Sequence, residues 1–462
     1  MRFSIVNIDT CRSSKDKIRL CFWIYLLLLI FEGAFRKWFL PGLSDIFLII
    51  RDPVALYVIA LGIEHNLVKN KVVYVLFLVS IISFVLTLIL GHHNLFVAIY
   101  GLRIIMLHVP CIFIFGVSLT NVDLLLIGKT VLRISVLMFL IILVQYFSPP
   151  TAWINSGVGG VGTSTFQGVG EYHRPSGTFS FTSGMAGFEM LTAVFIFYFL
   201  YSNYRLKERF KVHVIEMSVF VITFLFSIIL CLSRTVIFQT LLLFFMIILY
   251  PSLFEKKVSK SLYLIILTLV LAFILYQIDS FKIAYDNMLL RFEQASKVEG
   301  DVVDGTLGER FFGSFYRAFF NTQNFSGQEI PLFGFGLGIG TKVGEQILNI
   351  QSTGHSFAFA EEEWSRIICE MGLLQGGVLL LGIRLLYPIY LVSMAMKYIW
   401  VQKDVFLFLS SASFLLYFVK NQWAVPTNLG FTVVICSLFM VAYNQCRYKK
   451  NKNIHQTDIL RR

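Results

Sequence analysis

The sequence predicts an all-α membrane protein that crosses the bilayer about twelve times. Its mean hydropathy is +0.74. Hydrophobic residues make up 57% of the chain and charged residues only 14%, which excludes an ordinary soluble domain. Apolar runs of about 18–25 residues recur along the chain, and runs of that length can cross a bilayer as helices.

The first apolar run begins after Arg12, Lys15, Lys17 and Arg19, and Glu32 and Gly33 follow it instead of a small-residue cleavage site. We therefore expect an uncleaved first span rather than a signal peptide. The expected spans are residues 20–35, 46–62, 72–91, 95–118, 124–147, 180–202, 213–232, 235–254, 261–278, 366–394, 404–419 and 428–445.

Charge is distributed as membrane topology requires. The net charge is +12, but lysine and arginine gather in alternate connections, which argues against a nucleic-acid partner. The cationic connections include Lys69/Lys71, Arg205–Lys211, Lys256–Lys260 and the tail from Arg447. By the positive-inside rule these connections, and with an even number of spans both termini, face the cytoplasm.

Two long polar segments then face outward from a single integral membrane domain, residues 1–462. Residues 148–179 are rich in glycine and predict irregular backbone. Residues 279–355 form the larger outer loop, where apolar side chains at helical spacing from Phe281 to Phe292 predict a helix on the membrane surface. A second such helix is expected within 309–320, before the glycine-rich loop 331–340.

Arginines are the first candidates for chemistry. A charge inside a bilayer usually faces a cavity or a partner, so each intramembrane arginine suits helix–helix contact as well as function. At the outer face guanidinium groups suit the oxygens of a phosphate or diphosphate. The candidates for that anion site are Arg174, Arg234 and Arg310, with Arg51 as a fourth. Arg51 and Asp52 are expected to neutralise each other in part, and Arg384 to snorkel or to pair.

Carboxylates and histidines supply candidates for a general base. Glu361, Glu362 and Glu363 precede an expected span, with Arg366 three residues after Glu363 and His355 shortly before. Acidic residues are favoured at a helix N-terminus without any catalytic role, so the cluster has a structural reading too. Glu361, Glu363 and His355 are the base candidates; His173 is a weaker one.

Several site types are excluded by their missing motifs. The sequence has no Walker A, DxD, HExxH or GxSxG pattern, and the spacing of its glycine run differs from the dinucleotide fingerprint. Its seven cysteines show no CxxC spacing. We therefore expect neither a metal nor a cofactor.

Five pieces in order along the chain resemble the O-antigen polymerase/ligase superfamily. They are Glu32-Gly-Ala-Phe-Arg-Lys-Trp-Phe-Leu-Pro41 with Arg51-Asp-Pro53, Arg174-Pro-Ser-Gly-Thr-Phe179, Leu232-Ser-Arg-Thr235, Arg310 through Pro331-Leu-Phe-Gly-Phe-Gly336, and Glu370-Met-Gly372. In ligases of that family a histidine followed by asparagine or serine precedes the last glycine by a fixed short spacing. Here His355-Ser356 comes six residues too early and Glu361 occupies the expected position.

The resemblance implies a GT-C-like, metal-independent glycosyltransferase of the bacterial cytoplasmic membrane. It implies polymerisation of undecaprenyl-diphosphate-linked repeat units into O-antigen, capsule or exopolysaccharide at the outer face. A chain-length regulator and a flippase are implied partners. The alternatives are an O-antigen ligase, a lipid-linked oligosaccharide flippase and, ranked lower, a peptidoglycan-type polymerase. A transporter is expected to show internal repeats, and the sequence shows none, which argues against that alternative.

Overall fold

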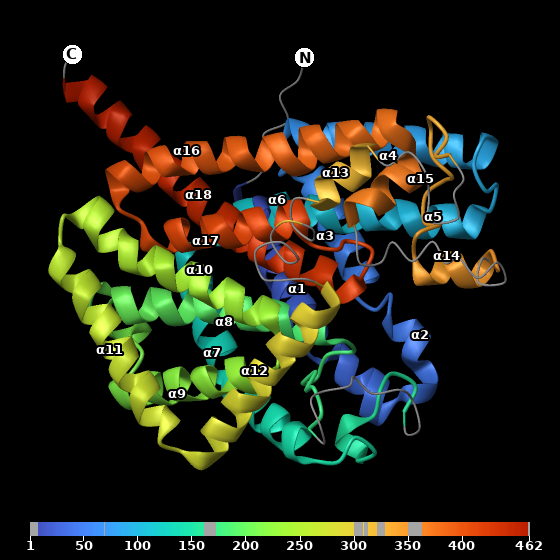
Figure 1. The fold of residues 1–462 in the computed structure, drawn as a ribbon. Helices are drawn as coiled ribbons and strands as arrows, with labels where there is room; N and C mark the ends of the chain where they lie inside the picture. Colours follow the sequence, from blue (N-terminus) through green and yellow to red (C-terminus); the bar gives the residue numbers. More distant parts are fainter. Residues whose placement is uncertain are drawn as a thin grey trace.

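The structure is a computed structural model that describes residues 8–68, 70–160, 172–299, 308, 313–320, 329–349 and 363–460. Within these ranges the chain is all-helical and has no strand, apart from one isolated bridge between Gly157 and Gly160 (Figure 1). The predicted fold class, an all-α multi-pass membrane protein, is confirmed at this level.

The first half of the chain forms the helices up to the first long polar segment. Their bounds are α1 (Ile8–Ala34), η1 (Phe35–Phe39), η2 (Pro41–Leu43), α2 (Ser44–Phe47), α3 (Asp52–Glu64), α4 (Lys71–Ile89), α5 (Leu95–Arg103), η3 (Ile104–His108), α6 (Val109–Ser118), α7 (Asn121–Phe147) and η4 (Trp153–Asn155). Side-chain caps satisfy backbone N–H groups at the N-termini of several of these helices. Asn70 accepts from the backbone N–H of Val72, and Thr120 with Asp123 forms a capping box at α7.

The second half has longer connections between its helices. These are α8 (Thr182–Ser202), η5 (Asn203–Arg205), η6 (Glu208–Phe210), α9 (Val214–Leu230), α10 (Arg234–Tyr250), η7 (Pro251–Glu255), α11 (Val258–Tyr276), α12 (Asp279–Glu299), α13 (Gly313–Phe320), α14 (Lys342–Ile347), α15 (Glu363–Gly377), η11 (Val378–Leu386), α16 (Tyr387–Gln402), α17 (Val405–Leu415), η12 (Leu416–Lys420) and α18 (Pro426–Leu460).

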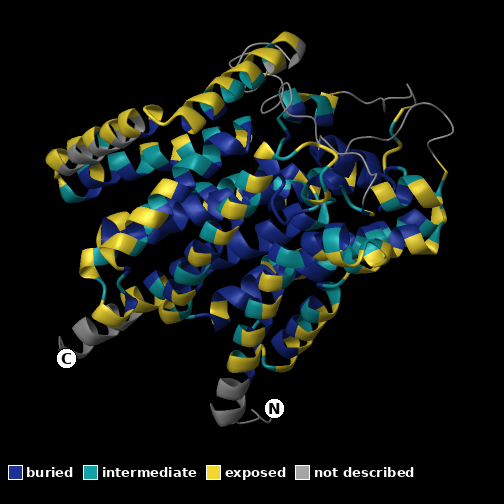
Figure 2. Cartoon of the chain, turned by 90° about the horizontal axis from the view of Figure 1, so that it is seen from below, coloured by how far each residue is buried: buried dark blue, intermediate teal, exposed yellow. Residues whose placement is uncertain are grey.

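In the described ranges ten helical stretches are long and apolar enough to cross a membrane. They coincide with ten of the expected spans, and the other two fall on α11 and on the shorter apolar helix Val405–Lys420. The number twelve therefore remains a prediction. The first helix begins and the last helix ends on the same side of the bundle (Figure 2).

Burial divides the bundle into a centre and a periphery. In α8 and α18 the apolar window is 83% and 89% buried, whereas in α4 it is only 28% buried. Buried residues accordingly fill the middle of the molecule and exposed ones line its outer helices (Figure 2). Apolar side chains on the peripheral helices are positioned to face lipid.

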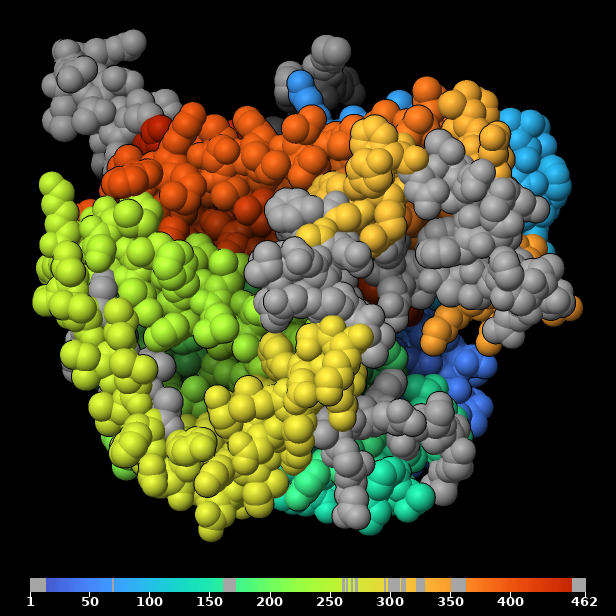
Figure 3. Space-filling model, viewed as in Figure 1, coloured from blue at the N-terminus to red at the C-terminus, as the bar shows by residue number. Residues whose placement is uncertain are grey.

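The long polar segment after α11 folds back against the bundle. Phe281 and Ala284 of α12 are buried against Ile229 and Leu230 at the end of α9, in a cluster that also includes Tyr146. Asn287 of α12 donates to the hydroxyl of Tyr146 at 2.8 Å. In the space-filling view α12 crosses the front face, between the green helices and the teal residues that follow α7 (Figure 3). The expected helices of this segment are present as α12 and α13.

Candidate functional site

The segment that leads into α8 is wedged between α1 and α18. A Cβ on Gly33 would lie 2.4 Å from the carbonyl oxygen of Thr178, so only glycine allows α1 to approach this closely. The hydroxyl of Thr178 donates to the carbonyl of Ile30 at 2.5 Å, and the ring of Phe179 packs edge-on against Phe431. The segment is thereby held in place by the core.

Gln145 and Lys37 fix the middle of this segment. Gly177 has a φ of +59° and its N–H donates to Oε1 of Gln145 at 2.8 Å. Nζ of Lys37 donates to the carbonyl of Gly177 at 2.7 Å and to the hydroxyl of Ser176 at 3.1 Å. Lys37 is 2% exposed, and no described carboxylate pairs with it. A buried ammonium group therefore stands against neutral acceptors.

Arg174 lies in the same segment, and its charge has no described counterion. Its Nε is buried and has no hydrogen-bond partner within the described residues. Burial lowers the pKa of Arg174, and the nearby positive charges of Arg291 and Arg234 lower it further. The three guanidinium groups come from the segment before α8, the start of α10 and the middle of α12, and they are near enough for the charges of Arg234 and Arg291 to act on Arg174. We call Arg174, Arg234 and Arg291 the outer arginine cluster, after the side of the membrane that the sequence predicts for them.

His173, next to Arg174, is buried at 3% exposure and its Nδ1 has no partner among the described residues. Burial lowers the pKa of His173 to about 4, and the positive charge of Lys37 adds to this effect. At neutral pH the imidazole is therefore uncharged. It can donate a hydrogen bond to a ligand or accept one from it, but it adds no positive charge to the cluster.

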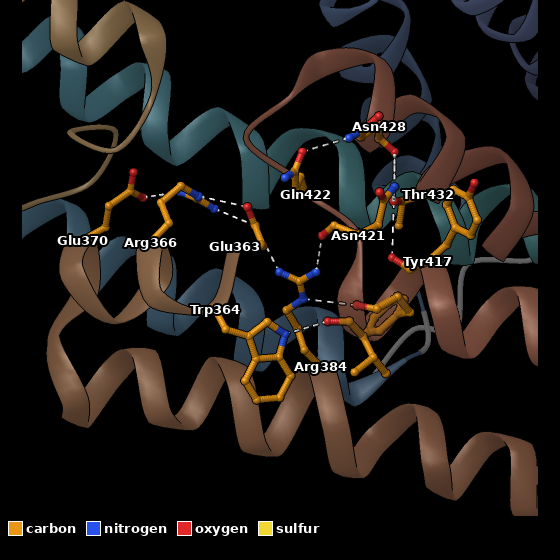
Figure 4. Close-up of polar contacts among 12 residues, drawn as sticks. Glu363, Trp364, Arg366, Glu370, Arg384, Tyr417, Asn421, Gln422, Asn428 and Thr432 are labelled. Atoms are coloured by element: carbon orange, nitrogen blue, oxygen red, sulfur yellow. Dashed lines mark hydrogen bonds and ion pairs between the residues drawn. The ribbon is translucent and has the colours of Figure 1, made fainter. Parts of the chain in front are cut away.

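A second polar cluster surrounds Glu363 at the start of α15 (Figure 4). Arg366 donates to both oxygens of this carboxylate, from Nε at 3.0 Å and from Nη2 at 2.7 Å. Nη1 of Arg384 donates to Oε1 at 3.0 Å. The carboxylate is 2% exposed, so two cations compensate its charge out of contact with water. We call Glu363, Arg366, Glu370 and Arg384 the Glu363 cluster.

Arg384 ties the Glu363 cluster to the connection before α18. Its Nη2 donates to the carbonyl of Asn421 at 2.6 Å and its Nε to the carbonyl of Phe418 at 3.1 Å. Its guanidinium lies 4.0 Å from the ring centre of Trp423. The expectation that Arg384 snorkels or pairs is thus resolved: it pairs with Glu363 and is fully buried.

Glu370 extends the cluster to the glycine-rich loop. Its Oε2 accepts from Nη1 of Arg366 at 2.5 Å, and its Oε1 accepts from the N–H of Gly340 at 3.0 Å. Gly338 has a φ of +85°, and a Cβ there would lie 2.3 Å from the carbonyl oxygen of Val97. A Cβ on Gly334 would likewise lie 2.5 Å from the carbonyl oxygen of Glu370, so both glycines are required where the loop packs against α5 and α15. Their backbone conformation is explained without a bound ligand.

Arg51 belongs to a third cluster at the end of α1. Its Nε donates to Oε2 of Glu32 at 3.0 Å and its Nη2 to the carbonyl of Pro426 at 2.8 Å. Arg36 lies 3.6 Å from the other oxygen of Glu32. Glu32, and not Asp52, is therefore the main partner of Arg51, which corrects the expected pairing of Arg51 with its neighbour.

Asp52 has its own partners. Nε of Arg103 donates to its Oδ2 at 2.7 Å, and Nε2 of His108 lies 3.0 Å from its Oδ1. The hydroxyl of Tyr25 lies 3.0 Å from the other ring nitrogen of His108. This chain of contacts joins α1, α3, α5 and η3 inside the bundle, and it accounts for the charge of Arg103 by helix–helix contact.

The predicted site residues have different outcomes. His355, Glu361 and Arg310 lie outside the described residues. Arg234 lies near enough to Arg174 for its positive charge to lower the pKa of Arg174, and their joint role as an anion site stays a prediction. Arg51 is bound to Glu32 instead, and Glu363 is bound by two arginines, an arrangement that keeps a carboxylate ionised and makes it a weak base. The catalytic roles proposed for all of these residues stay predictions.

Sequence reasoning missed three groups. The sequence spacing places Arg291 on the polar face of a surface helix and Lys37 in a connection, and neither position marks a site. Glu189 lies inside α8 at 2% exposure; the hydroxyl of Ser227 donates to its Oε1, and its Oε2 has no partner among the described residues. A single carboxylate in an apolar run is the signal that could have identified Glu189.

Comparison with known proteins adds no relative: no family model, curated protein or solved structure matches the chain. Within the described residues, no group of three or more histidine, cysteine, aspartate or glutamate side chains is placed to hold a metal ion. The proposal for function therefore rests on the clusters described above and on the sequence pieces quoted earlier.

Proposed function

We propose that the protein is a membrane glycosyltransferase that polymerises undecaprenyl-diphosphate-linked oligosaccharide repeat units into a surface polysaccharide. The reaction would take place at the outer face of the bacterial cytoplasmic membrane, with both termini in the cytoplasm. In this proposal the helical bundle is GT-C-like, and a chain-length regulator and a flippase act with it.

The outer arginine cluster carries the proposal. Arg174 has a buried Nε with no hydrogen-bond partner in the part of the chain that the structure describes, and the charges of two further guanidinium groups act on it. Gathering like charges is unfavourable unless an anion joins them. Arg366, Arg384 and Arg51 pair with carboxylates of the chain, whereas no described carboxylate pairs with Arg174. Arg174 is thus suited to an anion from outside the chain, and a diphosphate fits guanidinium donors.

The chemistry follows from that anion site. A hydroxyl oxygen of the acceptor sugar attacks the anomeric carbon of the donor, and the bond from that carbon to the diphosphate breaks. Negative charge then grows on the leaving diphosphate. Guanidinium groups that are already in position stabilise this charge without reorganising, which lowers the barrier. A single displacement of this kind inverts the configuration at the anomeric carbon.

The acceptor hydroxyl also loses a proton, so the reaction needs a base. His355 and Glu361 remain the proposed bases. Glu363 is the weaker choice because Arg366 and Arg384 both donate to it. In our proposal Glu363 instead holds the start of α15 in place, two residues after Glu361 in the sequence.

Arg174 gives the sharpest test. The gene is deleted and complemented with wild type, Arg174→Ala or Arg174→Lys, and glycans on the carrier lipid and at the cell surface are separated by length. We expect Arg174→Ala to lose long polymer while its amount in the membrane stays normal, and Arg174→Lys to retain part of it. Arg133→Ala is the matched control, because Arg133 is 63% exposed and paired with Glu216.

The same deletion separates the alternatives. A single repeat unit on the carrier at the outer face indicates a polymerase. Full-length polymer retained on the carrier indicates a ligase, and units retained at the cytoplasmic face indicate a flippase. Normal polymer length with Arg174→Ala, in protein present at wild-type amounts, would contradict the anion site.

A further inference from the structure

Two tryptophans and a lysine lie next to the segment that carries Arg174. The indole rings of Trp38 and Trp153 face each other with centroids 5.7 Å apart and planes tilted by 37°. Trp153 is 52% exposed. Nζ of Lys37 lies 4.6 Å from the ring centre of Trp38. Two aromatic rings and an ammonium group therefore meet next to the segment that carries Arg174.

The sequence builds this arrangement from two fixed elements. The π-helical turn η1 ends the first span, and such turns occur often at functional sites. It directs both Arg36 and Lys37 into the protein although they are neighbours in sequence. Trp153 begins the turn η4, which Asn155 fixes by donating to the carbonyls of Gln145, Ser148 and Pro149.

Buried polar atoms with no protein partner lie on the same elements. Within the described residues these are Nε1 of Trp38, Nδ1 of His173 and Oδ1 of Asn155. His173 and Asn155 are each 3% exposed. Lys37 is close enough to His173 for its charge to act on the imidazole. Unpartnered buried polar atoms are rare in proteins, and a ligand is one way to satisfy them.

We propose that this group is a saccharide subsite formed by Lys37, Trp38, Trp153 and His173. A pyranose presents an apolar C–H face, which stacks on indole, and hydroxyls, which both donate and accept hydrogen bonds. The indole N–H of Trp38 offers a donor, the ammonium group of Lys37 has one N–H beyond the two that Ser176 and Gly177 accept, and the neutral imidazole can donate or accept. The subsite rests on the proposed function, because it holds the sugar of the substrate whose diphosphate lies at Arg174.

Binding measurements on the purified full chain in lipid nanodiscs test the subsite apart from catalysis. Three probes are used: the carrier-linked glycan extracted from cells lacking the gene, the free oligosaccharide released from it by mild acid, and undecaprenyl diphosphate without sugar. The variants are Trp153→Ala, Trp153→Tyr and Arg174→Ala. Trp400→Ala is the matched control, since Trp400 is 58% exposed on α16.

We expect Trp153→Ala to weaken binding of the free oligosaccharide about tenfold, and Trp153→Tyr to restore much of it. Binding of undecaprenyl diphosphate should not change with either variant, and Trp400→Ala should alter the binding of none of the three probes. If Trp153 only anchors the protein at the membrane interface, free oligosaccharide will bind wild type and Trp153→Ala equally, which overturns the subsite.

The two proposals fail in different ways. If undecaprenyl diphosphate binds wild type and Arg174→Ala equally while the free oligosaccharide still depends on Trp153, the diphosphate site is wrong and the saccharide subsite stands. If undecaprenyl diphosphate depends on Arg174 but Trp153→Ala weakens both probes by the same factor, the subsite is overturned and the diphosphate site is kept.

Discussion

Glu363 and Arg384 form a buried ion pair of 3.0 Å across 21 residues of sequence. Between them Gly372 breaks the helix with a φ of 71° and a ψ of 174°. The pair therefore spans a bent element and holds its two parts together. Arg384 also donates to two carbonyls of the connection before α18, so one side chain joins three stretches of chain (Figure 4).

Replacing Arg384 with leucine should destabilise the protein strongly. The substitution leaves the Glu363 carboxylate with Arg366 alone and leaves the carbonyls of Phe418 and Asn421 without donors. Breaking a buried ion pair typically costs about 3–5 kcal/mol. The thermal midpoint of the purified protein in detergent should fall accordingly.

Arg133→Leu is the control for this prediction. Its ion pair with Glu216 is exposed, and such pairs contribute about 1 kcal/mol or less. An equal loss of thermal midpoint in Arg384→Leu and Arg133→Leu would contradict the importance given to the buried pair.

The glycine-rich loop gives a second stability prediction. Alanine at Gly338 would need a left-handed backbone, and its Cβ would lie 2.3 Å from the carbonyl oxygen of Val97. Both effects should lower the thermal midpoint and separate the loop from α5. Gly382→Ala is the control, because nothing lies within 4 Å of the Cβ that it adds. That variant should be as stable as wild type or slightly more so.

The apolar helices and the helices of the long polar segment could be predicted from the sequence because each depends on local composition. An apolar run is recognised whatever it packs against, and α12 follows from the spacing of Phe281 to Phe292. The partners of the charges could not be predicted. Arg51 pairs with Glu32, nineteen residues away, and not with its neighbour Asp52, because the packing of α1 against α3 brings Arg51 and Glu32 together. The partner of a buried charge thus depends on how the helices pack.

In the candidate site, too, some residues could be predicted from the local sequence and others only from the packing of the helices. Arg174 stood out by type and position. Arg291 did not, since a cation on the polar face of a helix is common, and only the packing of α12 against α9 brings it near Arg174. Likewise, the sequence spacing of Glu363 and Arg366 suggested one helix face, but the second arginine at Glu363 comes from beyond the break at Gly372.

His173 should make the protein less stable in acid. Its folded pKa of about 4 lies below the ordinary value of 6.5, so between these values the unfolded state binds more protons. Stability therefore falls as the pH drops from 6.5 toward 4, by less than the limit of about 1.4 kcal/mol per pH unit for one proton. His173→Gln removes this titration, so its thermal midpoint should fall less between about pH 8 and about pH 5.

Measurements at the higher pH control for packing. There the imidazole is neutral in both states, so any difference between wild type and His173→Gln reflects the new side chain rather than protonation. An identical loss of thermal midpoint on acidification in the two proteins would show that His173 is not the group that titrates.

Topology is the premise of both proposals, and two lysines test it. Lys297 of α12 is expected on the outer side of the cytoplasmic membrane and Lys207, in the cationic connection after α8, on its cytoplasmic side; both are exposed. A membrane-impermeant maleimide added to intact cells should label Lys297→Cys and leave Lys207→Cys unlabelled until the membrane is opened. The six native cysteines whose side chains are described are buried, and the unsubstituted protein supplies the background labelling. Because Arg291 and Lys297 lie on the same helix, labelling of Lys207→Cys alone would place the outer arginine cluster in the cytoplasm. A diphosphate site for an outward-facing polymerase would then be on the wrong side of the membrane.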